Sequence, residues 1–297
     1  MKEMNDVLCK LLWGYLQLMG LCPYAHMDKK AMINDFKTKT ALLNLYDRWL
    51  EESIEVLARN HYFYRKGDSY SLTDTALVDL QAVWKEWELK KGEWLKNPDL
   101  SAWVVLVEST LRKLPEILTG NIPATDIVFP QSSMKLVEGI YKNSPAADYF
   151  NEVLGDIVVS YLNERLKHDP SGSIRIIEIG AGTGGTSAML FRKLRPYQEY
   201  IREYCYTDKS RAFLLHAQKE YGPQNPYLTY KIFNVEESAV GQDIETGGYD
   251  IAIATNVLHA TRNIRQTLGN VKAALRKNGL ILINEISGNS LGGMVAL

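Results

Sequence analysis

The chain has 297 residues, enough for two domains of ordinary size, and 46% of them are hydrophobic, so a packed core can form. Charged residues make up 23% and the net charge is -1, which argues against a disordered chain and against binding to nucleic acid or an anionic membrane. The 3 cysteines are too few and too scattered for a disulfide framework or a zinc site, so we expect a reducing, cytoplasmic setting and no metal. The N-terminus lacks a secretory signal pattern, and no run approaches the roughly 20 apolar residues of a membrane span.

Residues 1–125 are predicted to form a mainly helical subdomain. Apolar side chains recur at helical spacing over Val7–Met19 and again over Lys39–Asn60. A small hairpin should follow, because the aromatic-rich runs Tyr62–Tyr64 and Tyr70–Leu72 flank a polar turn.

A helix cap at Leu72–Asp74 is expected to restart the helix, which continues toward Lys91. A helix followed by a hairpin is typical of winged-helix subdomains, some of which bind DNA. The basic face that DNA binding needs is absent from this segment, so we interpret it as a packing element without a nucleic-acid partner.

Residues 126–172 are interpreted as connecting helices. The stretch 115–130 before and into them is predicted to be irregular, a linker or a strap over a site. Pro145 interrupts the next helical pattern, which runs on clearly over Asp148–Lys167. The turn residues of Asp169–Gly172 then end it.

The remaining residues, 173–297, alternate strands with helices, which predicts parallel βαβ units and a doubly wound, Rossmann-like α/β core. Helices are expected at 186–194, 210–221 and 264–275. Strands are expected at 174–179, 203–207, 228–233, 249–255 and 280–284.

A glycine-rich turn follows the first of these strands. Gly180, Gly182 and Gly184 let the backbone pass close to a ligand, at the helix end that attracts negative groups. The spacing also matches the dinucleotide-binding pattern. A further alternative is a glycine turn that binds no ligand. Glu178 favours S-adenosylmethionine over NAD, because a carboxylate attracts an amino group and repels a pyrophosphate.

The next two strands end in polar residues that suit a nucleoside. Asp208 can accept both hydroxyls of a ribose, or else cap the helix that begins near Ser210. Asn234 ends the third strand, where the adenine ring is expected, and Val235 can pack on that ring.

The last two strands supply a candidate base. Asn256 is placed to meet the methionine part of the cofactor, and His259 faces the side from which a substrate arrives. Glu285 ends the neighbouring strand, where its carboxylate can hold the imidazole, so we predict a His259–Glu285 pair. The competing interpretation is a histidine that only packs.

Three motifs in this order resemble the C-methyltransferase domains of bacterial modular polyketide synthases, and the similarity extends upstream through residues 129–134 and 140–145. The motifs are EIGAGTGGTS (178–187), NVLHAT (256–261) and NEISGNS (284–290). The resemblance covers roughly residues 115–290. It implies a class I methyltransferase core with an N-terminal helical lid, to which Tyr141 and Tyr149 contribute.

The resemblance also implies a chemistry. The substrate is a β-ketoacyl chain on an acyl carrier protein, the cofactor is S-adenosylmethionine, and the neighbouring partners are other polyketide synthase domains. His259 and Glu285 match the family's base pair, which removes the acidic proton between two carbonyl groups.

The chain departs from this family at its end, 12 residues after Glu285, where two further strands normally follow. The fifth strand is then expected to be an exposed sheet edge, and the core to be C-terminally truncated, either as a fragment or as a naturally shortened domain. A truncated pseudo-methyltransferase, which serves as a structural or docking module without turnover, is therefore the alternative function. The motifs are also compatible with an O-methyltransferase and, less well, with an NAD-linked enzyme.

Overall fold

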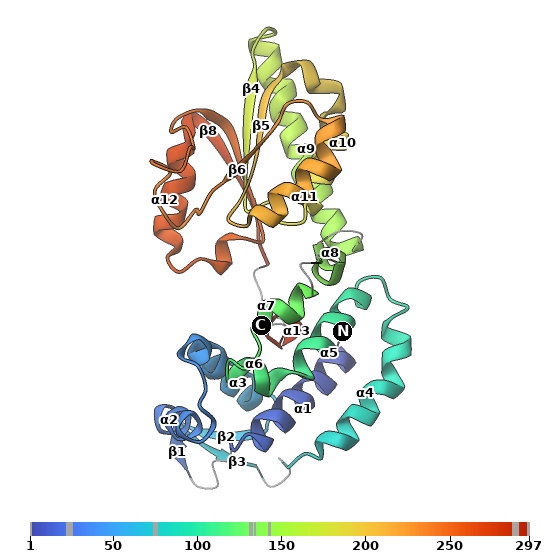
Figure 1. Ribbon diagram of the computed structural model, residues 1–297, viewed down its shortest axis with the longest axis vertical. Helices are drawn as coiled ribbons and strands as arrows, with labels where there is room; N and C mark the ends of the chain where they lie inside the picture. Colours follow the sequence, from blue (N-terminus) through green and yellow to red (C-terminus); the bar gives the residue numbers. More distant parts are fainter. Residues whose placement is uncertain are drawn as a thin grey trace. The chain divides into compact units, whose positions relative to one another are not determined.

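The computed structural model has two compact units, the first made of residues 1–137 and 288–297 and the second of residues 138–287 (Figure 1). No helix among the described residues is long and apolar enough to cross a membrane. The described residues are 2–21, 26–73, 77–130, 133, 135–141, 144–286 and 291–295, without the side chains of Lys135 and Tyr141.

The first unit is mainly helical and is built around α1. Apolar residues surround most of this helix, which is why it is buried on nearly all sides. Its fully buried Trp13 meets the ring of Phe63 edge-on, with ring centroids 5.2 Å apart. The described elements, with α8 at the unit's boundary, are α1 (Lys2–Leu18), β1 (Met27–Asp28), α2 (Lys29–Thr40), η1 (Asn44–Tyr46), α3 (Asp47–Arg59), β2 (Phe63–Lys66), β3 (Ser69–Leu72), α4 (Leu80–Trp94), α5 (Ser101–Leu111), α6 (Leu114–Leu118), α7 (Ala124–Val128), α8 (Lys135–Tyr141) and α13 (Leu291–Val295).

The prediction of one helical stretch over residues 39–60 is wrong. Helix α2 ends where Ala41 takes a left-handed backbone conformation with φ 55°, and α3 begins only at Asp47. The intervening backbone is held from outside the helix, because the N–H of Leu43 donates to the carbonyl of Leu118. This tertiary contact overrides the helical periodicity.

The predicted hairpin is confirmed. Strands β2 and β3 pair antiparallel, and the short β1 adds a third strand on the other side of β3. The predicted helix start is wrong, since α4 begins at Leu80 with Asp79 as its cap. The carboxylate of Asp79 accepts the N–H groups of Gln81 and Ala82 there. Asp74 lies outside the described residues.

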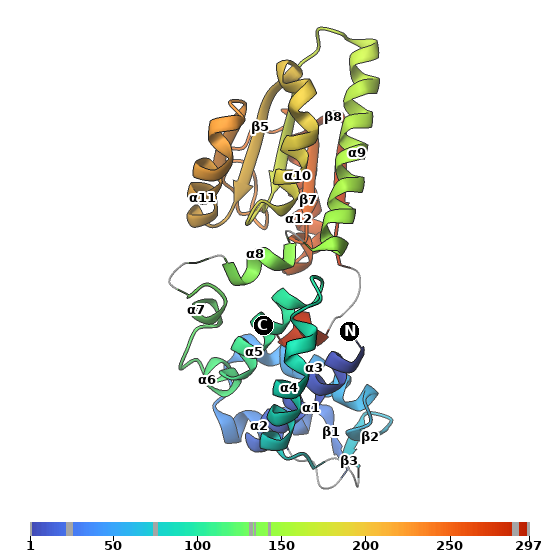
Figure 2. The ribbon, with the colours of Figure 1, turned by 90° about the vertical axis from the view of Figure 1, so that its right-hand side faces the viewer.

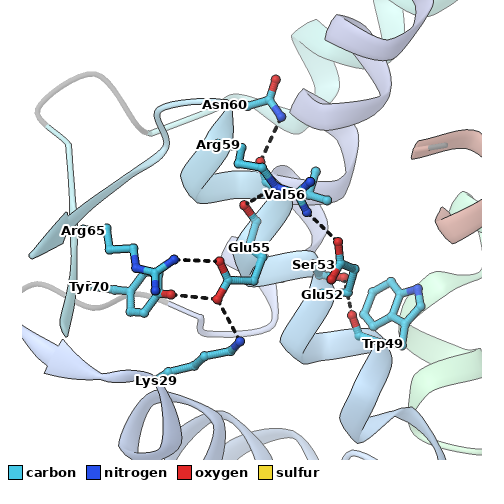
Figure 3. Close-up of polar contacts among 10 residues, drawn as sticks. All are labelled: Lys29, Trp49, Glu52, Ser53, Glu55, Val56, Arg59, Asn60, Arg65 and Tyr70. Carbon is cyan, nitrogen blue, oxygen red and sulfur yellow. Dashed lines mark hydrogen bonds and ion pairs between the residues drawn. The ribbon is translucent and has the colours of Figure 1, made fainter. Parts of the chain in front are cut away.

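A carboxylate on α3 ties the hairpin to the helices of the first unit (Figure 3). Glu55 Oε1 accepts from Lys29 Nζ and from the Tyr70 hydroxyl, each at 2.8 Å, and Arg65 Nη1 lies 3.2 Å from Oε2. Although burial opposes ionisation, these donors lower the pKa of Glu55. The pairing fixes the hairpin against α3.

The prediction that residues 115–130 are irregular is wrong, because they include most of α6 and all of α7. Pro115 fits the first turn of α6, where its missing N–H costs nothing. The last described residues return to this unit. Trp49 Nε1 donates to the carbonyl of Met294 at 2.8 Å, and the Thr110 hydroxyl donates to that of Val295 at 2.9 Å.

The second unit is a doubly wound α/β core, as predicted. Its five described strands are all parallel, in the order β6-β5-β4-β7-β8. In Figure 2, α9 runs alongside the strands of this sheet. The described elements are α9 (Pro145–His168), β4 (Ile174–Ile179), α10 (Gly185–Leu194), η3 (Arg195–Tyr200), β5 (Ile201–Asp208), α11 (Arg211–Tyr221), η4 (Gly222–Gln224), β6 (Leu228–Ile232), β7 (Tyr249–Thr255), η5 (Leu258–Ala260), α12 (Ile264–Ala274) and β8 (Leu275–Asn284).

Alternate residues of the strands pack on opposite faces of the sheet. Ile176 and Tyr204 point into a core with α9, α10 and α11, whereas Ile177 and Cys205 point into a core with α12. Both faces are covered, which explains the continuous apolar strands in the sequence. Helix α9 packs in the first of these cores and lies within the second unit.

The chain leaves β4 toward β5 on one side and later returns to β7 on the other, so strand order reverses beside β4. In such sheets ligands bind at this point, beyond the carboxyl ends of the strands. At the other end of the order, β8 pairs only with β7 among the described strands, and Ile283 is half-exposed.

Candidate active site

The glycine turn after β4 is closely packed at two of its glycines. Gly180, Gly182 and Gly184 have φ values of 58°, 57° and 79°, which glycine adopts without strain. A Cβ at Gly180 would lie 2.3 Å from Cγ2 of Val257, and one at Gly184 would lie 2.5 Å from the Tyr221 ring. One at Gly182 would meet only a backbone oxygen at 3.9 Å, so the turn is open there.

Two tyrosine hydroxyls, one from β5 and one from α11, hydrogen-bond to carbonyl groups of the turn. Tyr206 donates to the carbonyl of Gly182 at 2.9 Å, and Tyr221 donates to that of Thr183 at 3.2 Å. Sequence reasoning missed these residues. The signal was present in the alternation Tyr204-Cys-Tyr206, which places two tyrosines on the same face of a buried strand as the turn's helix.

Glu178 lies one residue before the end of β4 and is only 1% exposed. Its Oε2 accepts from the hydroxyls of Ser187 and Tyr204, each at 2.6 Å. Burial raises the pKa of Glu178 to about 7, the two hydroxyls work against that rise, and the nearby charge of Asp208 adds to it. The carboxyl therefore titrates near neutral pH.

Asp208 ends β5 beside the same turn. Its Oδ2 accepts the N–H of Gly182 at 3.0 Å, and its Oδ1 accepts the N–H of Ser210 at 2.7 Å. Burial raises its pKa despite these bonds. The structure therefore joins Asp208 to the glycine turn. It also joins Asp208 to the start of α11, which agrees with the alternative role of a helix cap.

Asn234 and Val235 follow β6. The Asn234 backbone N–H donates to Gln242 Oε1 at 2.8 Å, and its side-chain amide donates to Glu237 at 2.8 Å. Val235 is buried, and its carbonyl accepts from the Asn270 side chain at 2.9 Å. Their contact with an adenine ring stays a prediction.

A polar cavity of about 340 Å³ opens beside Asn234, at the carboxyl ends of the strands. The buried Thr267 hydroxyl has no hydrogen-bond partner among the described residues, so a ligand in this cavity could supply one. Sequence reasoning missed Thr267, which lies inside a helix with no motif around it. The cavity is lined by Lys209, Asn234, Glu236, Glu237, Arg262, Asn263, Gln266 and Thr267.

Asn256 joins the ends of β7 and β8. It adopts a left-handed backbone conformation, with φ 50°, that asparagine tolerates better than most residues. Its N–H donates to the carbonyl of Asn284 at 2.9 Å, and its Oδ1 accepts the N–H of Ile286 at 3.2 Å. The bend redirects the chain into the short turn η5, which carries His259.

The structure brings His259 and Glu285 together. His259 Nδ1 lies 2.5 Å from Glu285 Oε2, and Glu285 Oε1 accepts the N–H groups of Val257 and Leu258 at 2.9 and 2.7 Å. One carboxylate thus holds both the imidazole and the backbone that carries it. The side chain of His259 is 51% exposed, so its ring is accessible.

The arrangement fits S-adenosylmethionine better than a dinucleotide. Two carboxyl groups, Glu178 and Asp208, lie beside the glycine turn and would oppose a pyrophosphate there. An amino group and ribose hydroxyls suit them. No group of three or more metal-ligating side chains occurs within the described part of the chain.

Two parts of the predicted site, the side chain of Tyr141 and residues 287–290 of the third motif, lie outside the described residues. Tyr149 is 64% exposed, and its ring meets that of Phe150 edge-on. The predicted role of both tyrosines in a lid stays a prediction.

Residues 177–281 match the methyltransferase domain family. Over 98% of its length the chain is 54% identical to polyketide synthase PksM of Bacillus subtilis (strain 168), and it spans 7% of that synthase. The solved DszA carbon methyltransferase is 28% identical with a TM-score of 0.86, over 99% of this chain and 74% of that one. The solved CurJ carbon methyltransferase is 26% identical with a TM-score of 0.87, over 99% and 75% of the two chains.

Proposed function

This chain belongs to the methyltransferase domains of polyketide synthases, and from that premise we propose that it methylates carbon. The proposed reaction moves a methyl group from S-adenosylmethionine to the α-carbon of a β-ketoacyl thioester, which an acyl carrier protein carries. The observation that carries the proposal is the His259–Glu285 pair, held on a loop that packs against the glycine turn.

The cofactor would be held by the residues around the glycine turn. Glu178 would meet its amino group, Asp208 its ribose and Asn256 its methionine part, with the adenine at Asn234 and Val235. When bound, S-adenosylmethionine supplies a methyl group on a positively charged sulfur. The turn itself, with Gly182 at its open position, leaves room for a ligand to approach the backbone.

His259 would act as the general base. Its Nδ1 faces the carboxylate of Glu285, so the neutral ring carries its proton on Nδ1 and leaves Nε2 as the acceptor. A β-ketoacyl thioester has an acidic proton between two carbonyl groups, which Nε2 can remove. Glu285 then stabilises the imidazolium that forms, and its bonds to Val257 and Leu258 keep the ring in place.

The family supports the proposed substrate class and partners. The similarity to a segment of PksM favours a thioester-bound acyl chain, an acyl carrier protein and neighbouring synthase domains as partners. The similarity to DszA and CurJ, both carbon methyltransferases, favours transfer to carbon rather than to oxygen.

Incubation with S-adenosylmethionine and an acetoacetyl carrier protein tests the proposal. Intact-mass analysis should find the gain of one methyl group on the carrier-bound chain, and fragmentation should locate it on the α-carbon. A methyl group on oxygen would instead indicate an O-methyltransferase. Binding of S-adenosylmethionine without any mass gain would favour the pseudo-methyltransferase, and binding of NAD alone would overturn the cofactor assignment.

A further inference from the structure

Two buried hydroxyl groups hydrogen-bond to Glu178, which lies just before the glycine turn, and the proposed mechanism gives these hydroxyls no role. The Ser187 hydroxyl comes from the first turn of α10 and the Tyr204 hydroxyl from the middle of β5. Both donate to Glu178 Oε2 at 2.6 Å. Ser187 and Tyr204 are 0% exposed and Glu178 is 1% exposed, so bulk water does not compete for these bonds.

The ionised form of Glu178 depends on these two donors. Burial disfavours the carboxylate, and the charge of Asp208 on β5 disfavours it further. The other titratable groups that face it are the hydroxyls of Tyr204 and Tyr206, also on β5, and burial raises the pKa of both well above the usual tyrosine range. Tyr204 therefore stays a neutral donor, and loss of either donor leaves a carboxyl that holds its proton at neutral pH.

The two bonds also orient the carboxyl group. Because both end on Oε2, they do not occupy Oε1. The sheet side of the group is anchored to α10 and β5, and the turn that begins two residues later lies next to it. A carboxylate fixed on one oxygen presents the other in a constant direction, which lowers the entropic cost of binding a cation.

We propose that Ser187 and Tyr204 are positioning residues that favour the ionised form of Glu178 and orient it toward the cofactor's positively charged amino group. Through Glu178 they select ligands that carry an amino acid moiety over plain nucleosides. The inference rests on the proposed function, because it takes S-adenosylmethionine and its product as the ligands of the turn.

Calorimetric binding of two ligands tests this assignment. S-adenosylhomocysteine carries the amino group, and methylthioadenosine has the same nucleoside without it. Tyr204→Phe and Ser187→Ala should each lower the affinity for S-adenosylhomocysteine by about tenfold, the size expected when a buried carboxylate loses one donor. Both variants should bind methylthioadenosine with an affinity within about twofold of that of the unmodified chain. Tyr227→Phe is the matched control, because it removes another buried tyrosine hydroxyl, bonded to Asn225, and should weaken neither ligand.

The pH dependence separates positioning from mere structural support. In both variants Glu178 should ionise at a higher pH, so their loss of S-adenosylhomocysteine affinity should be largest near pH 6 and shrink as the pH rises. Equal weakening of both ligands, or a loss that does not change with pH, would overturn the assignment. Unchanged binding of S-adenosylhomocysteine by both variants would overturn it as well.

A measurement on the unmodified chain covers the case in which the variants do not fold. At pH 7 the binding of S-adenosylhomocysteine should release a fraction of a proton, seen as a difference in heat between two buffers, whereas methylthioadenosine should release none. Equal heats in both buffers would overturn the assignment. Failure of the unmodified chain to bind S-adenosylhomocysteine at all would instead overturn the proposed function, and the inference with it.

Discussion

Two glutamates of the second unit stand near the ends of strands yet occupy opposite environments. Glu178, near the end of β4, is 1% exposed and is bonded by two neutral hydroxyls. Glu285 follows β8 with its side chain 19% exposed, and it is bonded by two backbone N–H groups and by the ring of His259. The two carboxyl groups thus differ both in solvation and in their donors.

The comparison separates binding from reactivity. A fully buried carboxylate is costly to ionise, so Glu178 gains from a cationic ligand that compensates its charge. Glu285 already has a potential counter-charge in His259, and its backbone bonds fix a loop rather than a ligand. We therefore expect changes near Glu178 to alter affinity and stability, and changes near Glu285 to alter the rate.

The largest expected effect is on the rate. His259→Ala should slow methylation of an acetoacetyl carrier protein by about 10²–10⁴-fold, because the reaction loses its general base. Since the side chain is 51% exposed, unfolding free energy should change by less than about 0.5 kcal/mol. Initial rates by mass spectrometry and calorimetric binding of S-adenosylhomocysteine check both statements. An unchanged rate would contradict the base assignment.

The next effect is a pH-dependent stability at Glu178. Its pKa is about 7 in the folded protein and near 4.5 in the unfolded chain, so the folded state holds the proton more tightly. The resulting stabilisation is complete below pH 4.5 and is lost as the pH rises to about 7, by roughly 3 kcal/mol in all.

Glu178→Gln should remove this dependence. Chemical denaturation of both proteins between about pH 4.5 and pH 8 should find the variant gaining stability relative to the unmodified chain as the pH rises. A constant difference across that range would mean that Glu178 does not titrate there. The contrast between Glu178 and Glu285 would then have no electrostatic basis.

The core of the second unit was predictable because its strands are apolar, short and punctuated by glycine and polar residues. The expected strand at 249–255 matches β7 residue for residue. The first unit was harder, since the break between α2 and α3 depends on the contact of Leu43 with Leu118, 75 residues away. Local periodicity cannot report such a contact.

The candidate site also has a part that could be predicted from the sequence and a part that could not. The spacing of His259 and Glu285 after adjacent strands was enough to predict their pairing, because parallel strands end at one edge of a sheet. Ser187 ends the first motif, but the motif does not indicate what its hydroxyl bonds, and Tyr204 and Tyr206 lie in no motif. The bonds of all three hydroxyls depend on how α10 and β5 pack behind the turn. Sequence spacing indicates which side chains reach the edge, but not which ones support them.

A smaller effect is expected at the turn itself. Gly184→Ala should destabilise the second unit by about 2 kcal/mol, because its φ of 79° strains other residues and its Cβ would lie 2.5 Å from the Tyr221 ring. Gly269→Ala in α12 is the control, since a Cβ there meets nothing within 4 Å and helical Ala is favoured. Thermal unfolding should separate the two variants. Equal melting temperatures would show that the turn accommodates the added methyl group without loss of stability.

The smallest effect on ligand affinity is expected at Glu285, although the rate should fall there. Glu285→Gln keeps an oxygen that can accept the N–H groups of Val257 and Leu258, but its amide NH2 then faces His259 Nδ1. This arrangement favours the ring tautomer whose proton is on Nε2, which cannot accept the substrate proton, so methylation should slow by about 10²-fold or more. Glu285→Ala leaves the tautomer free but also frees both N–H groups, and it should slow methylation as well because the loop that positions the ring loses its anchor. S-adenosylhomocysteine should bind both variants like the unmodified chain. If Glu285→Gln kept the unmodified rate, the tautomer that Glu285 holds would not matter for the reaction. A loss of ligand affinity in either one would mean that the two ends of the site are not separate.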